Sequence, residues 1–142
     1  MRAVHKAEEI ARKAHHTQKR WNGSPYIEHP KRVASSFDDD ICKTVGWLHD
    51  ELEDTIITEQ DLIESGIPTG IINFVKTLTR REGETYYDFI LRIKRDPVAT
   101  KVKIADIEDN INDNLKECSL KDKYRLAKHI LEEEMKINER IF

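Results

Sequence analysis

The nine residues WLHDELEDT, positions 47–55, are the most informative stretch of this 142-residue chain. They place His49 next to Asp50 at the end of an apolar run, and Glu53 and Asp54 follow one helical turn later. The i, i+4 spacing stacks each member of the first pair with one of the second pair along the same side of a helix. Carboxylates this close repel one another unless a cation or solvent separates them.

Two interpretations of this stretch are open. In a chain in which 36% of the residues are charged, the first is a solvated acidic helix end. The second is a metal site, because a borderline divalent metal prefers mixed imidazole and carboxylate ligands. The adjacent pair His49-Asp50 supplies one ligand of each type.

Two further segments contain residues of the same types. PYIEHP, positions 25–30, holds His29 between two prolines, where a loop gives way to a helix. VKIADIEDN, positions 102–110, sets Asp106 in an otherwise apolar run, and aspartate is seldom buried without a partner. Each residue alone also fits a structural role, as a core histidine or as an aspartate bonded to the backbone. Taken together, the three segments predict an open metal site with two imidazoles and two carboxylates, formed by His29, His49, Asp50 and Asp106.

The remaining sequence predicts helices and no confident strand. Apolar residues between positions 3 and 18 recur at i, i+3/i+4 and i+7, which indicates an amphipathic helix. The pattern Thr58-x-x-Asp61 resembles a capping box before a short helix. The chain has only five glycines and four prolines, and this small number argues against a turn-dense all-β fold. We therefore expect an all-α bundle of six to eight helices, with helical stretches at 3–18, from about 30, at 41–53, before 66, and at 71–78, 86–93, 98–111 and 120–141.

Length and composition limit the class of protein. A chain of 142 residues and 16.7 kDa predicts one domain, residues 1–142. A net charge of −3 argues against nucleic-acid binding driven by charge. Two cysteines without paired spacing fit a reducing cytosol and exclude a Cys-rich zinc module. The chain has no apolar run of about 18 residues and no signal-peptide pattern, so we expect a cytoplasmic protein without a membrane partner.

The motifs HP, LHDxxED and VKxAD, in this order and spacing, resemble those of the HD-domain metal-dependent phosphohydrolases. With AHHTQKRWNGSPYIEHPKRVA at 14–34, the chain looks most like the hydrolase domain of RelA/SpoT-type proteins, and especially like the small alarmone hydrolases. The resemblance runs from about Ala7 to Asn110. It implies an all-α HD fold around a metal site. It also implies a small-molecule nucleotide substrate, because the family removes the 3′-pyrophosphate of ppGpp or pppGpp, usually with manganese, to give GDP or GTP.

The resemblance also implies a role for each matching position. The expected metal ligands are His29, His49, Asp50 and Asp106. Glu53 and Asp54 match the acidic pair thought to act on water. Arg20 matches a basic residue that lies against the guanine base, and Asn110 matches an asparagine near the ribose and phosphates. Tyr124 is a looser match to an aromatic residue that closes the pocket.

Three positions depart from the family pattern. Trp21 stands where lysine is usual, Ile107 where arginine or lysine is common, and Asp109 where histidine or tyrosine is common. These changes make the surroundings of a polyphosphate more negative, so two alternatives stay open: an HD phosphohydrolase for another nucleotide, or a nucleotide sensor without turnover. Trp21 itself either caps the edge of the core or stacks on a purine base. Compensating charge could come from Arg80, Arg81, Lys101 or Lys103, unless these side chains are simply solvated.

Overall fold

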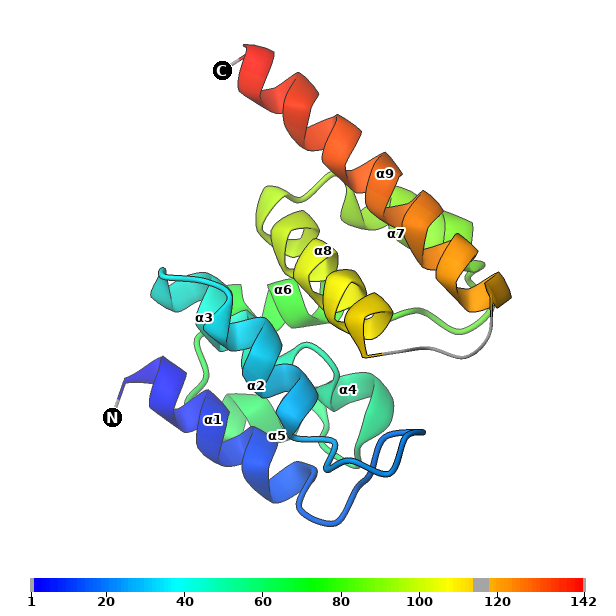
Figure 1. Ribbon diagram of the computed structural model, residues 1–142. Coiled ribbons are helices and arrows are strands. Elements are labelled where there is room, and N and C mark those ends of the chain that lie inside the picture. Colours follow the sequence, from blue (N-terminus) through cyan, green and yellow to red (C-terminus); the bar gives the residue numbers. More distant parts are fainter. Residues whose placement is uncertain (1, 114–117, 142) are drawn as a thin grey trace. The chain divides into compact units, whose positions relative to one another are not determined.

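The computed structural model describes residues 2–113 and 118–141, and within these ranges it contains nine helices and no strand (Figure 1). The all-α prediction is therefore confirmed. The helices are α1 (Ala3–Ala14), α2 (Glu28–Ser35), α3 (Asp40–Leu48), α4 (Glu51–Asp54), α5 (Glu59–Glu64), α6 (Thr69–Thr77), α7 (Tyr86–Ile93), α8 (Pro97–Asn112) and α9 (Cys118–Ile141).

The helix expected over 41–53 is two helices in the structure. α3 ends at Leu48 and α4 begins at Glu51, so His49 and Asp50 lie in the turn between them. The reason is local, because Nδ1 of His49 lies 2.6 Å from the carbonyl oxygen of Gly46. In a continuous α-helix this carbonyl would accept the amide of Asp50, and a side chain inserted into that ladder interrupts the helix.

The capping signal at Thr58 is confirmed. The Thr58 side chain accepts a hydrogen bond from the Asp61 amide, and the Asp61 side chain accepts one from the Thr58 amide. This reciprocal pair satisfies two amides at the start of α5.

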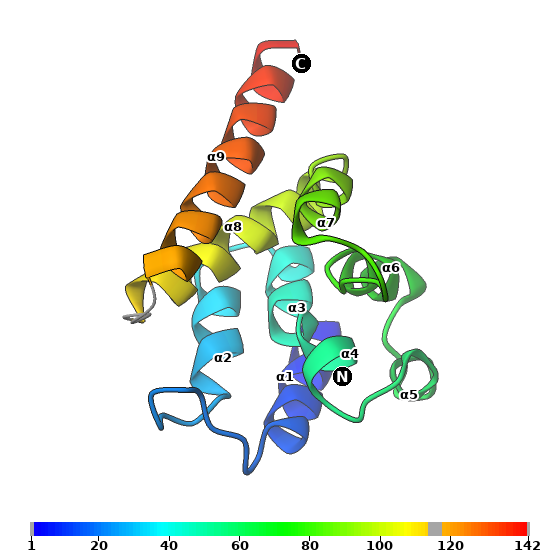
Figure 2. The same cartoon turned by 90° about the vertical axis from the view of Figure 1, so that its right-hand side faces the viewer.

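The chain forms two compact units, Met1–Thr79 and Arg80–Phe142, here called the first and second units. In the first unit, α3 packs against α1, α2 and α6, and α5 contacts α6 (Figure 2). Its core is apolar and includes Val45 and Leu48, which are fully buried. In the second unit, α7, α8 and α9 pack against one another around Phe89 and Leu131. The expectation of one domain over 1–142 stays a prediction.

The close approach of α2 and α3 depends on Gly46. A Cβ atom at this position would lie 2.9 Å from Cα of Ala34 and 3.0 Å from its amide nitrogen. Only glycine lets the two backbones come this close without a shift. The contact is important for the site because α2 carries His29 and α3 leads directly into His49.

Among the described residues, none of the helices combines the length and the apolar character needed to cross a membrane.

Candidate metal centre

Three side chains of the first unit converge on one point. His29, near the start of α2, and His49, in the turn directly after α3, are both buried, and their Nε2 atoms lie 3.3 Å apart. Oδ2 of Asp50 lies 3.1 Å from Nε2 of His49 and 3.5 Å from Nε2 of His29. The structure therefore brings together the three expected metal ligands of this unit, with their donor atoms close to one another.

The spacing of these atoms fits a shared divalent ion. Such ions bind nitrogen and oxygen at about 2.0–2.2 Å, so two ligands at right angles lie about 3 Å apart. The distances of 3.1, 3.3 and 3.5 Å between the three donor atoms agree with that geometry. The donor set of two imidazoles and a carboxylate is also the mixed set that a borderline metal prefers.

His49 is oriented by its second ring nitrogen. The Gly46 carbonyl oxygen lies 2.6 Å from Nδ1, so the proton of the neutral ring is held on Nδ1. Nε2 is then left with its lone pair directed at His29 and Asp50. This is the arrangement by which proteins fix the tautomer of a metal-binding histidine.

Tyr26 links Asp50, an expected metal ligand, to Asp54, one of the two acids expected to act on water. Its hydroxyl donates to Oδ2 of Asp50 at 2.7 Å and lies 3.1 Å from Oδ2 of Asp54. Partial desolvation and the negative charge of Asp50 raise the pKa of Asp54, although much of this residue is open to solvent. Glu53 is exposed on the same short helix, α4. Both acids are thus accessible from solvent, close in sequence to the imidazole cluster.

A buried ion pair lies next to this cluster, and the sequence did not reveal it. Nε2 of His15 is 2.7 Å from Oε1 of Glu51, and neither side chain is exposed. Burial opposes the charged imidazole, but the contacts with Glu51 and Gln18 outweigh it and raise the pKa of His15. Burial also raises the pKa of Glu51, against the effect of His15. Both shifts favour a proton held between the two side chains.

The signal for this pair in the sequence was weak. Glu51 stands in a run of acids and looks like one more solvated carboxylate, although its helix turns it inward. His15 lies next to His16, and nothing in the local pattern distinguishes the buried histidine from its exposed neighbour. Within PYIEHP, no local pattern marks Tyr26 either.

Asp106 lies on α8 in the second unit and is buried. Its Oδ2 accepts a hydrogen bond from Nζ of Lys103 at 2.8 Å, and the Asn110 side chain lies 3.4 Å from its Oδ1. These two side-chain contacts hold the buried carboxylate on α8. Ile107, one of the departures from the family pattern, is fully buried and belongs to the core.

The segment before α2 contains the expected base-binding residues. Arg20 is largely buried, and its guanidinium lies 5.9 Å from the centre of the Tyr26 ring. Trp21 lies in the turn that follows and is 48% exposed. The half-exposed indole is not part of a sealed core, and part of the side chain is open to solvent.

Tyr124 lies on α9 in the second unit, with its ring edge-on to that of Tyr86 at 6.2 Å. Nζ of Lys123 is 4.0 Å from the centre of the Tyr86 ring. Burial and the charges of Arg80 and Lys103 lower the pKa of Lys123, while burial raises the pKa of Tyr86 to about 12. The second unit therefore contains a cluster of cationic and aromatic side chains. It includes Arg80 and Lys103, two of the four basic residues that were expected to offset negative charge near a polyphosphate.

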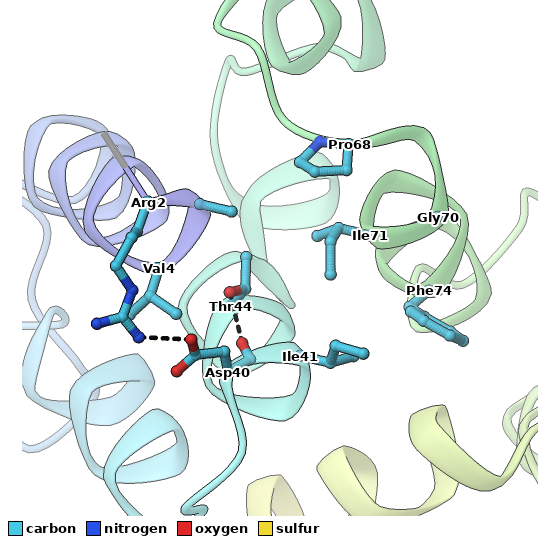
Figure 3. A pocket seen from close by; sticks show the side chains of 10 residues that line it. Arg2, Val4, Asp40, Ile41, Thr44, Pro68, Gly70, Ile71 and Phe74 are labelled. Carbon is cyan, nitrogen blue, oxygen red and sulfur yellow. Dashed lines mark hydrogen bonds and ion pairs between the residues drawn. The ribbon is translucent and has the colours of Figure 1, made fainter.

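The first unit also contains a pocket of about 420 Å³ (Figure 3). It is lined mainly by apolar side chains that include Val4, Ile71 and Phe74, and an Arg2–Asp40 ion pair stands beside them. None of the predicted site residues lines it.

No family model matches the chain, but individual proteins do. The chain is 35% identical over 137 residues to a guanosine-3′,5′-bis(diphosphate) 3′-pyrophosphohydrolase of Haemophilus influenzae, covering 87% of this chain and 20% of that protein. It is 32% identical over 119 residues to a protein of the same name from Aquifex aeolicus, covering 76% and 17%. A probable GTP pyrophosphokinase of Mycobacterium leprae is 37% identical over 115 residues, covering 72% and 15%. The chain thus spans a fifth or less of the length of these relatives.

A solved structure shares the fold. It is that of a metazoan SpoT ortholog described as hydrolysing ppGpp, and it matches with a TM-score of 0.76 over 94% of this chain and 85% of that chain, at 19% identity. The order of the motifs, the all-helical fold and the named relatives lead to one conclusion: the chain belongs to the HD-domain proteins of the RelA/SpoT type.

Proposed function

We propose that this protein is a manganese-dependent hydrolase that removes the 3′-pyrophosphate of ppGpp or pppGpp, giving GDP or GTP and pyrophosphate. In the reaction the phosphoester bond to the 3′ oxygen of the ribose breaks. Water supplies the oxygen that ends on the pyrophosphate, and the 3′ oxygen takes up a proton. The observation that carries the proposal is the convergence of His29, His49 and Asp50 in a chain related to proteins named for this reaction.

The proposed ligands of the ion are His29, His49, Asp50 and Asp106. A bound divalent ion neutralises phosphate charge and makes water more acidic. The donor set supports a borderline metal such as Mn²⁺, because two imidazoles are combined with hard carboxylate oxygens.

Glu53 and Asp54 are proposed to orient the attacking water and to accept its proton. Their exposure supports this role, because water and substrate can reach both carboxylates. Arg20, Trp21, Asn110 and Tyr124 are proposed to contact the nucleotide.

A second candidate substrate follows from Trp21. An exposed indole stands where the family usually has a lysine. We propose that stacking of this ring on the base takes the place of the lysine charge. This favours a purine nucleotide but does not by itself select ppGpp, and an HD phosphohydrolase for another nucleotide is the alternative.

A substrate panel with Mn²⁺ tests both candidates. Purified protein is incubated with ppGpp, pppGpp, GTP, ATP and deoxynucleoside triphosphates, and the products are separated by ion-exchange chromatography. We expect pyrophosphate and GDP in equal amounts from ppGpp. Turnover of another nucleotide alone would support the alternative, and binding of ppGpp without turnover by metal-loaded protein would show a sensor instead.

A further inference from the structure

We propose that Tyr26 is a positioning residue of the metal site, whose hydroxyl fixes the ligand oxygen of Asp50 and holds Asp54 beside it. This inference rests on the proposed function, because it assumes that an ion binds to Asp50. It assigns no chemical step to Tyr26, which acts through the two carboxylates.

The Tyr26 hydroxyl contacts the Asp50 oxygen that is proposed to bind the ion. Oδ2 of Asp50 faces the two imidazoles, and this same atom accepts the 2.7 Å hydrogen bond from Tyr26. A carboxylate can rotate about its last bond, and a donor on Oδ2 favours the orientation in which this oxygen faces the imidazoles. Loss of such an outer contact typically weakens metal binding about tenfold to a hundredfold.

The Tyr26 ring is itself held on several sides. It stacks on the ring of His15, with the ring centres 4.6 Å apart and the planes at 28°, and it meets the His29 ring edge-on at 5.9 Å. The Arg20 guanidinium lies at 5.9 Å from its centre. These contacts leave the phenol little freedom, so its hydroxyl is presented to Asp50 in one position.

His15 is anchored in turn by two side chains. The Gln18 side-chain oxygen lies 2.7 Å from its Nδ1, and Glu51 lies 2.7 Å from its Nε2. Because Glu51 follows Asp50 in the chain, the His15–Glu51 and Tyr26–Asp50 contacts are two adjacent ties between the segment before α2 and the start of α4.

The His15–Glu51 pair contributes more to geometry than to stability. A buried ion pair is often no better for stability than apolar side chains of the same volume. Here Oε2 of Glu51 is also buried and has no hydrogen-bond partner among the described residues, which carries a free-energy cost. A fixed position for His15, and through it for Tyr26, is what this pair supplies.

The test removes one oxygen atom. Tyr26→Phe keeps the ring and its stacking but deletes the hydroxyl, and the matched control is Tyr87→Phe, which deletes a hydroxyl from an exposed residue of α7. Mn²⁺ affinity is measured by calorimetric titration of metal-free protein, well below the melting temperature of each variant. The metal-free melting temperature and the steady-state constants for ppGpp are measured in parallel.

We expect Tyr26→Phe to bind Mn²⁺ about tenfold to a hundredfold more weakly than the wild-type protein, with the metal-free melting temperature little changed. At saturating Mn²⁺, kcat should fall while KM for ppGpp stays nearly constant, and Tyr87→Phe should match the wild-type protein throughout. Wild-type Mn²⁺ affinity in Tyr26→Phe would overturn the inference and leave the proposed function intact. A wild-type protein that binds no Mn²⁺ would overturn the proposed function itself.

Discussion

The backbone of Gly46 in α3 lies so close to Ala34 in α2 that a Cβ atom on Gly46 would come within 2.9 Å of Cα of Ala34. The same glycine supplies the carbonyl oxygen that orients His49. The separation of the two imidazoles therefore depends on a residue that carries no side chain.

Gly46→Ala should destabilise the protein, because the added methyl group forces α2 and α3 apart. We expect a loss of about 1–3 kcal/mol in the free energy of unfolding, measured by urea titration, and weaker Mn²⁺ binding. Gly70→Ala in α6 is the matched control, since a Cβ there meets nothing within 4 Å. Equal stabilities for the two variants would contradict the close-packing account.

Glu53→Gln and Asp54→Asn should distinguish the residues proposed to act on water from the proposed metal ligands. Both changes keep the size of the side chain but remove its negative charge. Each should lower turnover of ppGpp about a hundredfold while Mn²⁺ stays bound, whereas Asp50→Asn should lose the metal. Metal content and kcat are measured on the same samples. Loss of Mn²⁺ from either acid variant would make that residue a ligand.

Trp21→Ala should raise KM for a purine substrate roughly tenfold to a hundredfold with little change in kcat, because base stacking is worth about 1–3 kcal/mol. The half-exposed indole contributes little to the core, so the melting temperature should hold. In a Trp47→Phe background, Trp21 is the only indole, and its fluorescence should be quenched by nucleotide. An unchanged KM with a large loss of thermal stability would show that Trp21 is structural.

Glu84 should make stability depend on pH in the acid range. Its hydrogen bonds from the Arg92 guanidinium lower the pKa of Glu84 from 4.5 to about 2. The pair therefore stabilises the folded state above pH 4.5, and this contribution is lost as the pH falls from 4.5 towards 2.

We expect Glu84→Gln to be less stable than the wild-type protein at pH 7 by about 1 kcal/mol, after allowance for screening by solvent. The difference should shrink as the pH approaches 2. Urea titrations at both pH values measure it, with exposed Glu82→Gln as the control. A difference that is the same at both pH values would contradict the role of this ion pair.

The helices could be predicted from the sequence because their signals are local. Apolar spacing identified α1, and the reciprocal pair at Thr58 and Asp61 identified the start of α5. The break between α3 and α4 was missed, because it depends on a bond from the His49 ring to the Gly46 carbonyl that leaves no trace in the residue pattern.

In the candidate site, too, some residues could be predicted from local motifs, whereas contacts between distant residues could not. His29, His49 and Asp50 could be predicted because imidazoles and carboxylates in these motifs resemble a known ligand set. The His15–Glu51 pair and the Tyr26 hydroxyl bond could not, because each joins residues at least 24 positions apart. Such contacts depend on how α1, α2 and α3 pack, and the packing depends on close approaches such as that at Gly46.

The most direct test of the metal site is the Mn²⁺ content of purified protein after equilibrium dialysis, with His49→Ala dialysed in parallel. If the imidazoles and Asp50 hold an ion, the wild-type protein should retain about one Mn²⁺ per chain and His49→Ala should retain almost none. Removal of the ion by a chelator should also lower the melting temperature of the wild-type protein. Equal Mn²⁺ contents in the two proteins, or a wild-type protein without the ion, would contradict the site described here.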